Sequence, residues 1–238
     1  MTETTGDSIW LRPPRAGRGP APEFTRGQIA AAGVALADAD GLAAVTMRAV
    51  ADALGTGPAS LYRYVATRDE LLELMADEVN GEFRYSGLGA GGWLDDLLAL
   101  AHQGRGIYRR HPWMLDLTGT RAPIGPNAVD HLEHALAALA DLDLDPRAKL
   151  EAVGVFNGTV ALLARMEIAQ ELAGGTLSQW QRSQAAYLAD VVTAGRHPHL
   201  ASALTASSPD RADPGEPLFD RVLTRVLAGL LGTAGGQP

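Results

Sequence analysis

Apolar side chains recur every three or four positions along most of this chain, with polar residues between them. This period matches the α-helix, and no segment shows the strict apolar–polar alternation that indicates a β-strand. Thr67 and Glu70, three residues apart, predict a capping box at the start of one helix. The pattern therefore predicts an all-α fold. Helices are expected at residues 25–40, 46–54, 57–64, 67–83, 93–111, 125–139, 145–173, 178–195 and 218–231.

The composition excludes several classes of protein. The chain has 238 residues and no cysteine, which excludes disulfide scaffolds, zinc fingers, iron–sulfur clusters and thiol nucleophiles. Its apolar runs of about half a dozen residues are shorter than the roughly 20 that a membrane span needs. A secretory signal begins with basic residues, and residues 1–10 hold none. We expect a cytoplasmic protein with no membrane partner.

The formal net charge of −8 is unevenly distributed. Residues 10–68 hold seven arginines and four acids, whereas residues 71–238 hold thirteen basic residues and twenty acids. This asymmetry favours a small module facing DNA or phosphate on an acidic body. Ordinary scatter explains an excess of this size equally well, so charge alone leaves the question open.

Residues 45–72 carry the most informative pattern, two short helical segments joined by a glycine turn. Ala51 is small where the two helices must touch, and Gly55 suits the left-handed residue that follows a helix. Leu54 and Leu61 are placed to hold the pair to a core. This is the arrangement of a helix-turn-helix.

The second of these helices carries side chains suited to DNA. Small residues at its start allow it to enter a major groove about 12 Å wide, and an arginine there can read guanine. The side chains on its short or exposed positions are Ala59, Ser60, Tyr62, Arg63 and Tyr64. Tyr62, Thr46 and Thr67, together with the helix N-termini, can hold backbone phosphates.

The pattern T-x-R-x-V-A-x-x-L-G-x-x-x-x-x-L-Y-R-Y-V-x-x-R-x-x-L resembles the DNA-binding domain of the TetR family of bacterial repressors, over residues 24–72. The resemblance implies a homodimer that binds double-stranded DNA at a palindromic operator. It implies DNA contacts by ten residues: backbone clamps at Thr46 and Arg48, a base-facing set of Pro58, Ala59, Ser60 and Arg63, and phosphate contacts at Tyr62, Tyr64, Thr67 and Arg68. Arg68 stands where many relatives have lysine.

The remaining chain resembles, more weakly, the regulatory domain of the tetracycline repressor. Three regions are expected: a flexible basic arm at 1–23, a three-helix helix-turn-helix DNA-binding domain at 24–66, and a larger helical domain for effector binding and dimerisation at 67–238. The arm is rich in Pro, Gly and Arg. Residues Arg12–Arg18 could contact DNA, as basic arms can, or the arm could have no role. Leu117 replaces a histidine that ligates drug-bound magnesium, so we expect no metal site and no cofactor.

Polar or aromatic residues that interrupt the apolar helices of the body are candidate contacts to a small hydrophobic effector. They are His102, Trp113, Thr120, Arg121, His131, His134, Phe156, Asn157 and Met166. Methionine and aromatic residues at helical spacing are equally typical of an ordinary core. Two histidines without a third ligand are more often a surface pair than a metal site.

The last expected helix has two adjacent apolar stripes, at 218, 222, 226 and 230 and at 219, 223, 227 and 231. Gly154 and Gly158 lie four residues apart on a long helix. These features predict a dimer face, or else ordinary core packing.

No nucleophile with its base and no carboxylate pair in a cleft is visible, so we expect no enzyme. The sequence predicts a DNA-binding transcriptional regulator of the repressor type. The alternative is a ligand-binding all-α protein whose helix-turn-helix is vestigial or recruits a protein partner.

Overall fold

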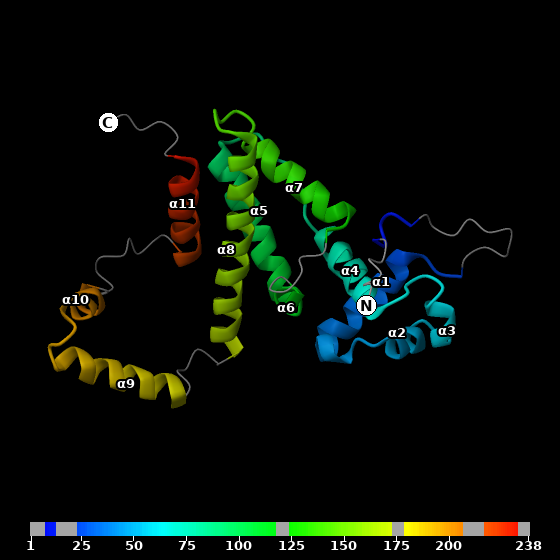
Figure 1. Ribbon diagram of the computed structural model, residues 1–238, viewed down its shortest axis with the longest axis horizontal. Coiled ribbons are helices and arrows are strands. Elements are labelled where there is room, and N and C mark those ends of the chain that lie inside the picture. The colour runs from blue at the N-terminus through cyan, green and yellow to red at the C-terminus, as the bar shows by residue number, and fades with distance from the viewer. Residues whose placement is uncertain (1–7, 13–22, 118–123, 173–178, 207–216, 233–238) are drawn as a thin grey trace, which may run out of the picture. The chain divides into compact units, whose positions relative to one another are not determined.

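A computed structural model describes residues 8–12, 23–117, 124–172, 179–206 and 217–232, and within them the chain forms helices and no strand (Figure 1). The all-α prediction is confirmed. The elements are α1 (Arg26–Asp40), the 3-10 helix η1 (Leu42–Ala44), α2 (Met47–Ala53), α3 (Pro58–Leu61), α4 (Arg68–Asn80), α5 (Trp93–Arg110), α6 (Met114–Leu117), α7 (Pro126–Ala138), α8 (Pro146–Leu172), α9 (Gln179–Thr193), α10 (Pro198–Ala206) and α11 (Leu218–Leu231). The sequence pattern missed η1, α6 and α10, of which η1 and α6, with three and four residues, are too short to show a helical period.

Side-chain caps determine where the first helices begin. Thr25 and Gln28 form a complete capping box at α1, since each side chain accepts the other residue's backbone N–H. At α4 only half of the predicted box is present. Thr67 Oγ1 accepts from Glu70 N at 3.1 Å, but the Glu70 carboxylate accepts from Ala66 N at 2.7 Å instead of from Thr67.

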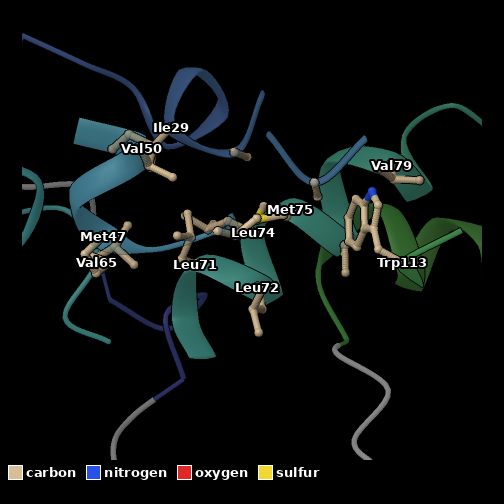
Figure 2. Close-up of a cluster of buried hydrophobic side chains, with 14 of the residues drawn as sticks. Ile29, Met47, Val50, Val65, Leu71, Leu72, Leu74, Met75, Val79 and Trp113 are labelled. Carbon is tan, nitrogen blue, oxygen red and sulfur yellow. The ribbon is translucent and has the colours of Figure 1, made fainter. Parts of the chain in front are cut away.

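The N-terminal helices surround one hydrophobic core (Figure 2). Helix α1 packs against α4, and Ile29, Leu71 and Met75 between them are fully buried. A Cβ at Gly33 would lie only 2.6 Å from the Met75 sulfur, so glycine permits this close approach. The cluster continues along α4 to Trp113, which follows α5. The core therefore joins the helix-turn-helix to the helices that come after it.

The structure differs from the prediction of a flexible arm at Ser8–Arg12. Ile9 is fully buried in the hydrophobic core, and Trp10 packs against that core. The Arg26 guanidinium donates to the carbonyls of Ile9 at 2.9 Å and Arg12 at 3.3 Å, and Arg12 forms an ion pair with Glu70. Burial of apolar surface and these bonds hold the segment in place, although its composition alone gives no indication of an ordered structure. The expected arginines at 15 and 18 lie outside the described residues.

By its contacts the chain divides into two compact units, Met1–Ala161 and Leu162–Pro238. In the first unit α4 lies between α1 and α7 and packs against both (Figure 1). The predicted boundary between residues 66 and 67 therefore crosses a continuous core, and it stays a prediction about the division of function.

In the second unit, the two predicted stripes of α11 differ in their surroundings. Phe219, Leu223, Leu227 and Leu231 are buried. On the adjacent stripe Leu218 and Leu230 are 56% and 43% exposed. An exposed apolar stripe on a folded chain is a candidate contact surface.

Candidate nucleic-acid interface and internal cavity

The helix-turn-helix consists of α2, a turn through Gly55 and α3. Thr46 Oγ1 accepts from Ala49 N at 3.0 Å and caps α2. Gly55 has φ +70°, the left-handed conformation that the sequence predicted at this turn. Val50 and Leu61, one from each helix, are fully buried and fix the angle between α2 and α3.

The outer face of this unit carries the predicted DNA contacts at accessible positions. Leu61 is buried, so the other side chains of α3 and its C-terminal turn face outward. Arg48, Pro58, Ala59, Tyr62, Arg63, Thr67 and Arg68 are exposed, and Ser60 and Tyr64 are partly exposed. The surface has the small residues and the arginine that major-groove reading requires.

Several of these residues already have partners within the chain. The Arg63 guanidinium donates to Ser60 Oγ at 2.6 Å and lies folded along α3. The Tyr64 hydroxyl accepts from Glu23 N at 3.1 Å, and its ring packs edge-on against Phe24. Both groups retain further N–H or O–H donors for DNA.

Arg68 has a structural task beside its predicted phosphate contact. Its Nε donates to the Val45 carbonyl at 3.0 Å and another guanidinium nitrogen donates to the Leu42 carbonyl at 2.9 Å. These bonds tie the start of α4 to the segment that enters α2. A lysine, with one nitrogen, could not reproduce this geometry, which explains the arginine at this position.

A cavity of about 390 Å³ lies inside the first unit, within the range of small-molecule sites. The part of its lining that the structure describes carries no Asp, Glu, Lys or Arg. The lining residues are Ala76, Asn80, Phe83, Leu100, Ala101, Gly104, Ile107, Tyr108, Met114, Leu117, Ile124, Ala128, His131, Leu132, Gly154, Phe156, Asn157, Gly158, Val160 and Ala161. Among the residues that the structure describes, no cluster of three acidic or histidine side chains could hold a metal ion.

Three predicted effector residues, His131, Phe156 and Asn157, line this cavity together. Four others do not. His102 on α5 is exposed, and Met166 on α8 is 56% exposed. The His134 ring stacks on the Tyr85 ring, with 3.8 Å between the ring centroids. Trp113 belongs to the hydrophobic core. Thr120 and Arg121 lie outside the described residues.

Sequence reasoning missed several wall residues, including Asn80, Phe83 and Tyr108. Phe83, just beyond the end of α4, and Tyr108, on α5, gave the same apolar signal as a core position. Asn80 could have been predicted as a wall residue, since it is an amide near the end of an otherwise apolar stripe.

The polar groups of the cavity wall are neutral. Nε2 of His131 lies 3.2 Å from Oδ1 of Asn157, and the His131 ring packs on Phe83 at 4.2 Å. Burial lowers the pKa of His131 below its ordinary value, against the effect of the Asn157 hydrogen bond. Burial raises the pKa of the Tyr108 phenol. Near neutral pH the described part of the wall therefore carries no charge.

Asp77 links α4 to α7, which forms part of the cavity wall. Its carboxylate accepts from Ala128 N at 3.1 Å and from Asn127 Nδ2 at 3.2 Å, so a side chain of α4 caps α7. Burial raises the pKa of Asp77, and these hydrogen bonds oppose the shift. A Cβ at Gly125 would collide with the Asp77 carboxyl group, so only glycine fits at the N-cap.

A second link joins α1 to the segment after α4. His111 Nδ1 lies 2.7 Å from Asp38 Oδ1, and its Nε2 lies 3.0 Å from Glu82 Oε1. Trp113 Nε1 also donates to Asp38 Oδ1 at 2.7 Å, and Arg110 pairs with Glu82. Displacement of the segment that carries Phe83 would therefore be transmitted to α1.

Glu82→Gln tests the strength of this link through its pH dependence. Burial raises the pKa of Glu82, but hydrogen bonds from Arg110 and His111 outweigh it and leave the pKa lowered. The carboxylate therefore stabilises the fold above pH 4.5, and this contribution is lost as the pH falls through the lowered pKa. At pH 7 we expect Glu82→Gln to lower the melting temperature by roughly 2–4 °C. On acidification, the difference in melting temperature between the variant and the native chain should disappear. Thermal unfolding from pH 7 to 3.5 measures this, with the exposed Glu133→Gln as control; a gap independent of pH would contradict it.

Comparison with known protein families gives two matches that together cover most of the chain. Residues 29–75 match the family described as "Bacterial regulatory proteins, tetR family". Residues 87–233 match the "Tetracyclin repressor-like, C-terminal domain". The first match contains the helix-turn-helix, and the second contains most of the cavity wall.

Individual relatives extend over nearly the whole chain. It is 37% identical to the HTH-type transcriptional repressor DrrR1 of Streptomyces coeruleorubidus, over 96% of this chain and 88% of that one. It is 32% identical to an HTH-type transcriptional regulator of Saccharopolyspora erythraea, over 98% and 95%. Apo ActR of Streptomyces coelicolor has a similar structure, with a TM-score of 0.72, 27% identity and 90% and 99% coverage. ActR in complex with actinorhodin matches with a TM-score of 0.67, 26% identity and 90% and 98% coverage. The predicted family is confirmed, and the chain belongs to the tetR family of bacterial regulatory proteins.

Proposed function

We propose that this chain is a homodimeric, cytoplasmic transcriptional repressor that leaves a palindromic operator when a small apolar effector occupies the cavity. The observation that carries the proposal is the position of α4. Leu71, in its first turn, belongs to the core beneath the helix-turn-helix, and Ala76 and Asn80, further along, line the cavity. One helix thus contacts both the DNA-reading part and the effector site.

The relatives support each half of this proposal. DrrR1 is named a transcriptional repressor, and ActR has been crystallised with the small molecule actinorhodin. Effector binding that displaces α4 through Phe83 or through the Asp77 cap would change the position of α3 relative to DNA. By linkage, operator DNA must then weaken effector binding by the same factor.

The cytoplasmic location is compatible with the one long apolar helix. Among the described residues α8 alone has the length and composition to cross a membrane, with a mean hydropathy of 1.3 in its most apolar window. Val153 and Phe156 on α8 are core residues, however. We therefore assign its exposed apolar positions to contact with a second copy.

Binding to the DNA immediately upstream of the chain's own coding sequence tests the proposal. We expect tight binding to one palindromic stretch in the presence of non-specific competitor, and a steep decrease in affinity with salt. Weak binding that is blind to sequence would instead favour a ligand-binding protein with a vestigial helix-turn-helix.

Arg63→Ala tests base reading within that assay. Because Arg63 is exposed beside the small residues of α3, its loss is expected to weaken operator binding by about 1–3 kcal/mol and to relax sequence preference. Arg48→Ala is the matched control, since loss of a contact to the DNA backbone should weaken binding to specific and to competitor DNA alike. Unchanged affinity and footprint for Arg63→Ala would refute the base-reading role.

A further inference from the structure

We propose that the segment Ser8–Arg12 is a strap that couples the start of α7, beside the cavity, to the turn between α3 and α4, and that Trp10 is its positioning residue. The inference rests on the proposed function, because it adds a second connection between the effector site and the DNA-reading part to the one that α4 provides. It follows from the contacts at the two ends of the strap.

One end of the strap packs on the start of α7. Gly125, the N-cap of α7, is buried, and a Cβ there would lie 2.7 Å from Cζ2 of Trp10 and would collide with the carboxyl group of Asp77. The indole ring therefore lies directly against this backbone. Ile124 and Ala128, on either side of Gly125 in the chain, line the cavity. A shift of the wall at this point must displace Trp10, because close-packed atoms transmit strain.

The other end of the strap reaches the turn between α3 and α4. The Arg12 guanidinium forms an ion pair with Oε2 of Glu70, and the same oxygen accepts a hydrogen bond from Ala66 N at 2.7 Å. Only 17% of the Glu70 side chain is exposed, so solvent screens this pair weakly. Ala66 lies in the turn that follows α3. The ion pair therefore helps to fix the backbone that joins α3 to α4.

The middle of the strap is held firmly. Ile9 is fully buried in the core. The planar guanidinium of Arg26 donates to the carbonyls of Ile9 and Arg12, at 2.9 and 3.3 Å, and so holds both halves of the strap at once. A backbone hydrogen bond of 3.0 Å closes a turn across Ser8–Leu11. A displacement of Trp10 is therefore passed on to Arg12 instead of being absorbed between them.

The strap gives the proposed regulator a second path from the effector site to DNA. A molecule that displaces the start of α7 would move Trp10, and through Arg12 it would weaken the hold of Glu70 on the turn after α3. Since coupling between two sites is reciprocal, operator DNA that fixes this turn must in the same way restrict the start of α7. We therefore expect both ends of the strap to respond to a change at either one.

The test is hydrogen exchange of backbone amides in the full chain without DNA, measured by NMR at both ends of the strap. Ala128 N, bonded to the side chain that caps α7, reports on the start of that helix, and Ala66 N, bonded to the partner of Arg12, reports on the turn. In Arg12→Gln we expect exchange at Ala128 to be about three- to tenfold faster, although the substitution lies at the other end. In Trp10→Ala we expect a similar increase at Ala66.

Leu11→Ala is the matched control, since Leu11 belongs to the same segment but is 79% exposed, and it should leave exchange at both ends unchanged. Trp10→Phe, which keeps an aromatic ring, should restore most of the protection at Ala66. The amides of Val153 and Phe156, buried residues of α8, report general destabilisation, which would accelerate their exchange as well. An increase confined to the substituted end, or one equalled at Val153 and Phe156, would overturn the inference.

Addition of the upstream DNA fragment separates this inference from the proposed function. In the native chain, bound DNA should slow exchange at Ala128, and in Trp10→Ala this response should be lost. Ends that respond together in a chain without specific DNA binding would support the strap and overturn the proposed function. Specific DNA binding by a chain whose ends respond independently would support the regulator and overturn the strap.

Discussion

The double variant Val226→Glu/Leu230→Glu is expected to be a folded monomer whose operator affinity is lower by about a hundredfold or more. A dimer binds two half-sites through one linked molecule, and this linkage raises affinity by roughly 10²–10⁴-fold. Leu230 is 43% exposed and Val226 is half-buried, so charges there cost the single chain little. Between two copies, the same four carboxylates would be buried without partners.

Helix α8 offers independent support for an interface between copies. Val155 on α8 is 46% exposed, whereas Gly154 and Gly158 on the same helix line the cavity. An exposed apolar position on a long helix is a candidate contact for a helix of a second copy. An isologous interface of this kind would bring two helix-turn-helix units to one operator.

Leu227→Glu is the matched control for the dimer test. Leu227 is adjacent to Val226 but fully buried, so its charge should unfold the chain rather than only separate the copies. Sedimentation gives the oligomeric state, and circular dichroism gives the helix content. A double variant that remains dimeric would place the interface elsewhere.

The helix-turn-helix could be predicted in detail because its determinants are local. Thr46 caps α2, Gly55 adopts the left-handed turn, and Leu61 is buried, as the pattern indicated. Each outcome depends on residues within one or two turns of the chain. Helix period and capping chemistry report such short-range structure well.

The cavity could be predicted only in part because it depends on how helices meet. Phe156 and Met166 both interrupt α8 and looked equivalent, yet Phe156 is 1% and Met166 56% exposed. The period of one helix shows that a face is apolar, but not whether a core, a cavity or a second copy covers it. The two stripes of α11 illustrate the same limit.

Ile9 was missed for a related reason, and its substitution gives the second large expected effect. Ile9→Ala should lower the free energy of unfolding by about 2–4 kcal/mol, because the side chain is fully buried and its removal leaves a cavity beside the core of α1 and α4. Leu11→Ala, two residues further along, should change it by less than about 0.5 kcal/mol, since Leu11 is 79% exposed.

Urea unfolding of both variants measures this difference. The comparison is sharp because both changes remove a branched aliphatic side chain from the same short segment, and only their burial differs. Equal and small losses would mean that Ser8–Arg12 is not held on the core in solution. A large loss at Ile9 alone would make this segment part of the folded DNA-reading unit, with the Arg26 bonds and the Arg12–Glu70 ion pair fixing its path across α1 and α4.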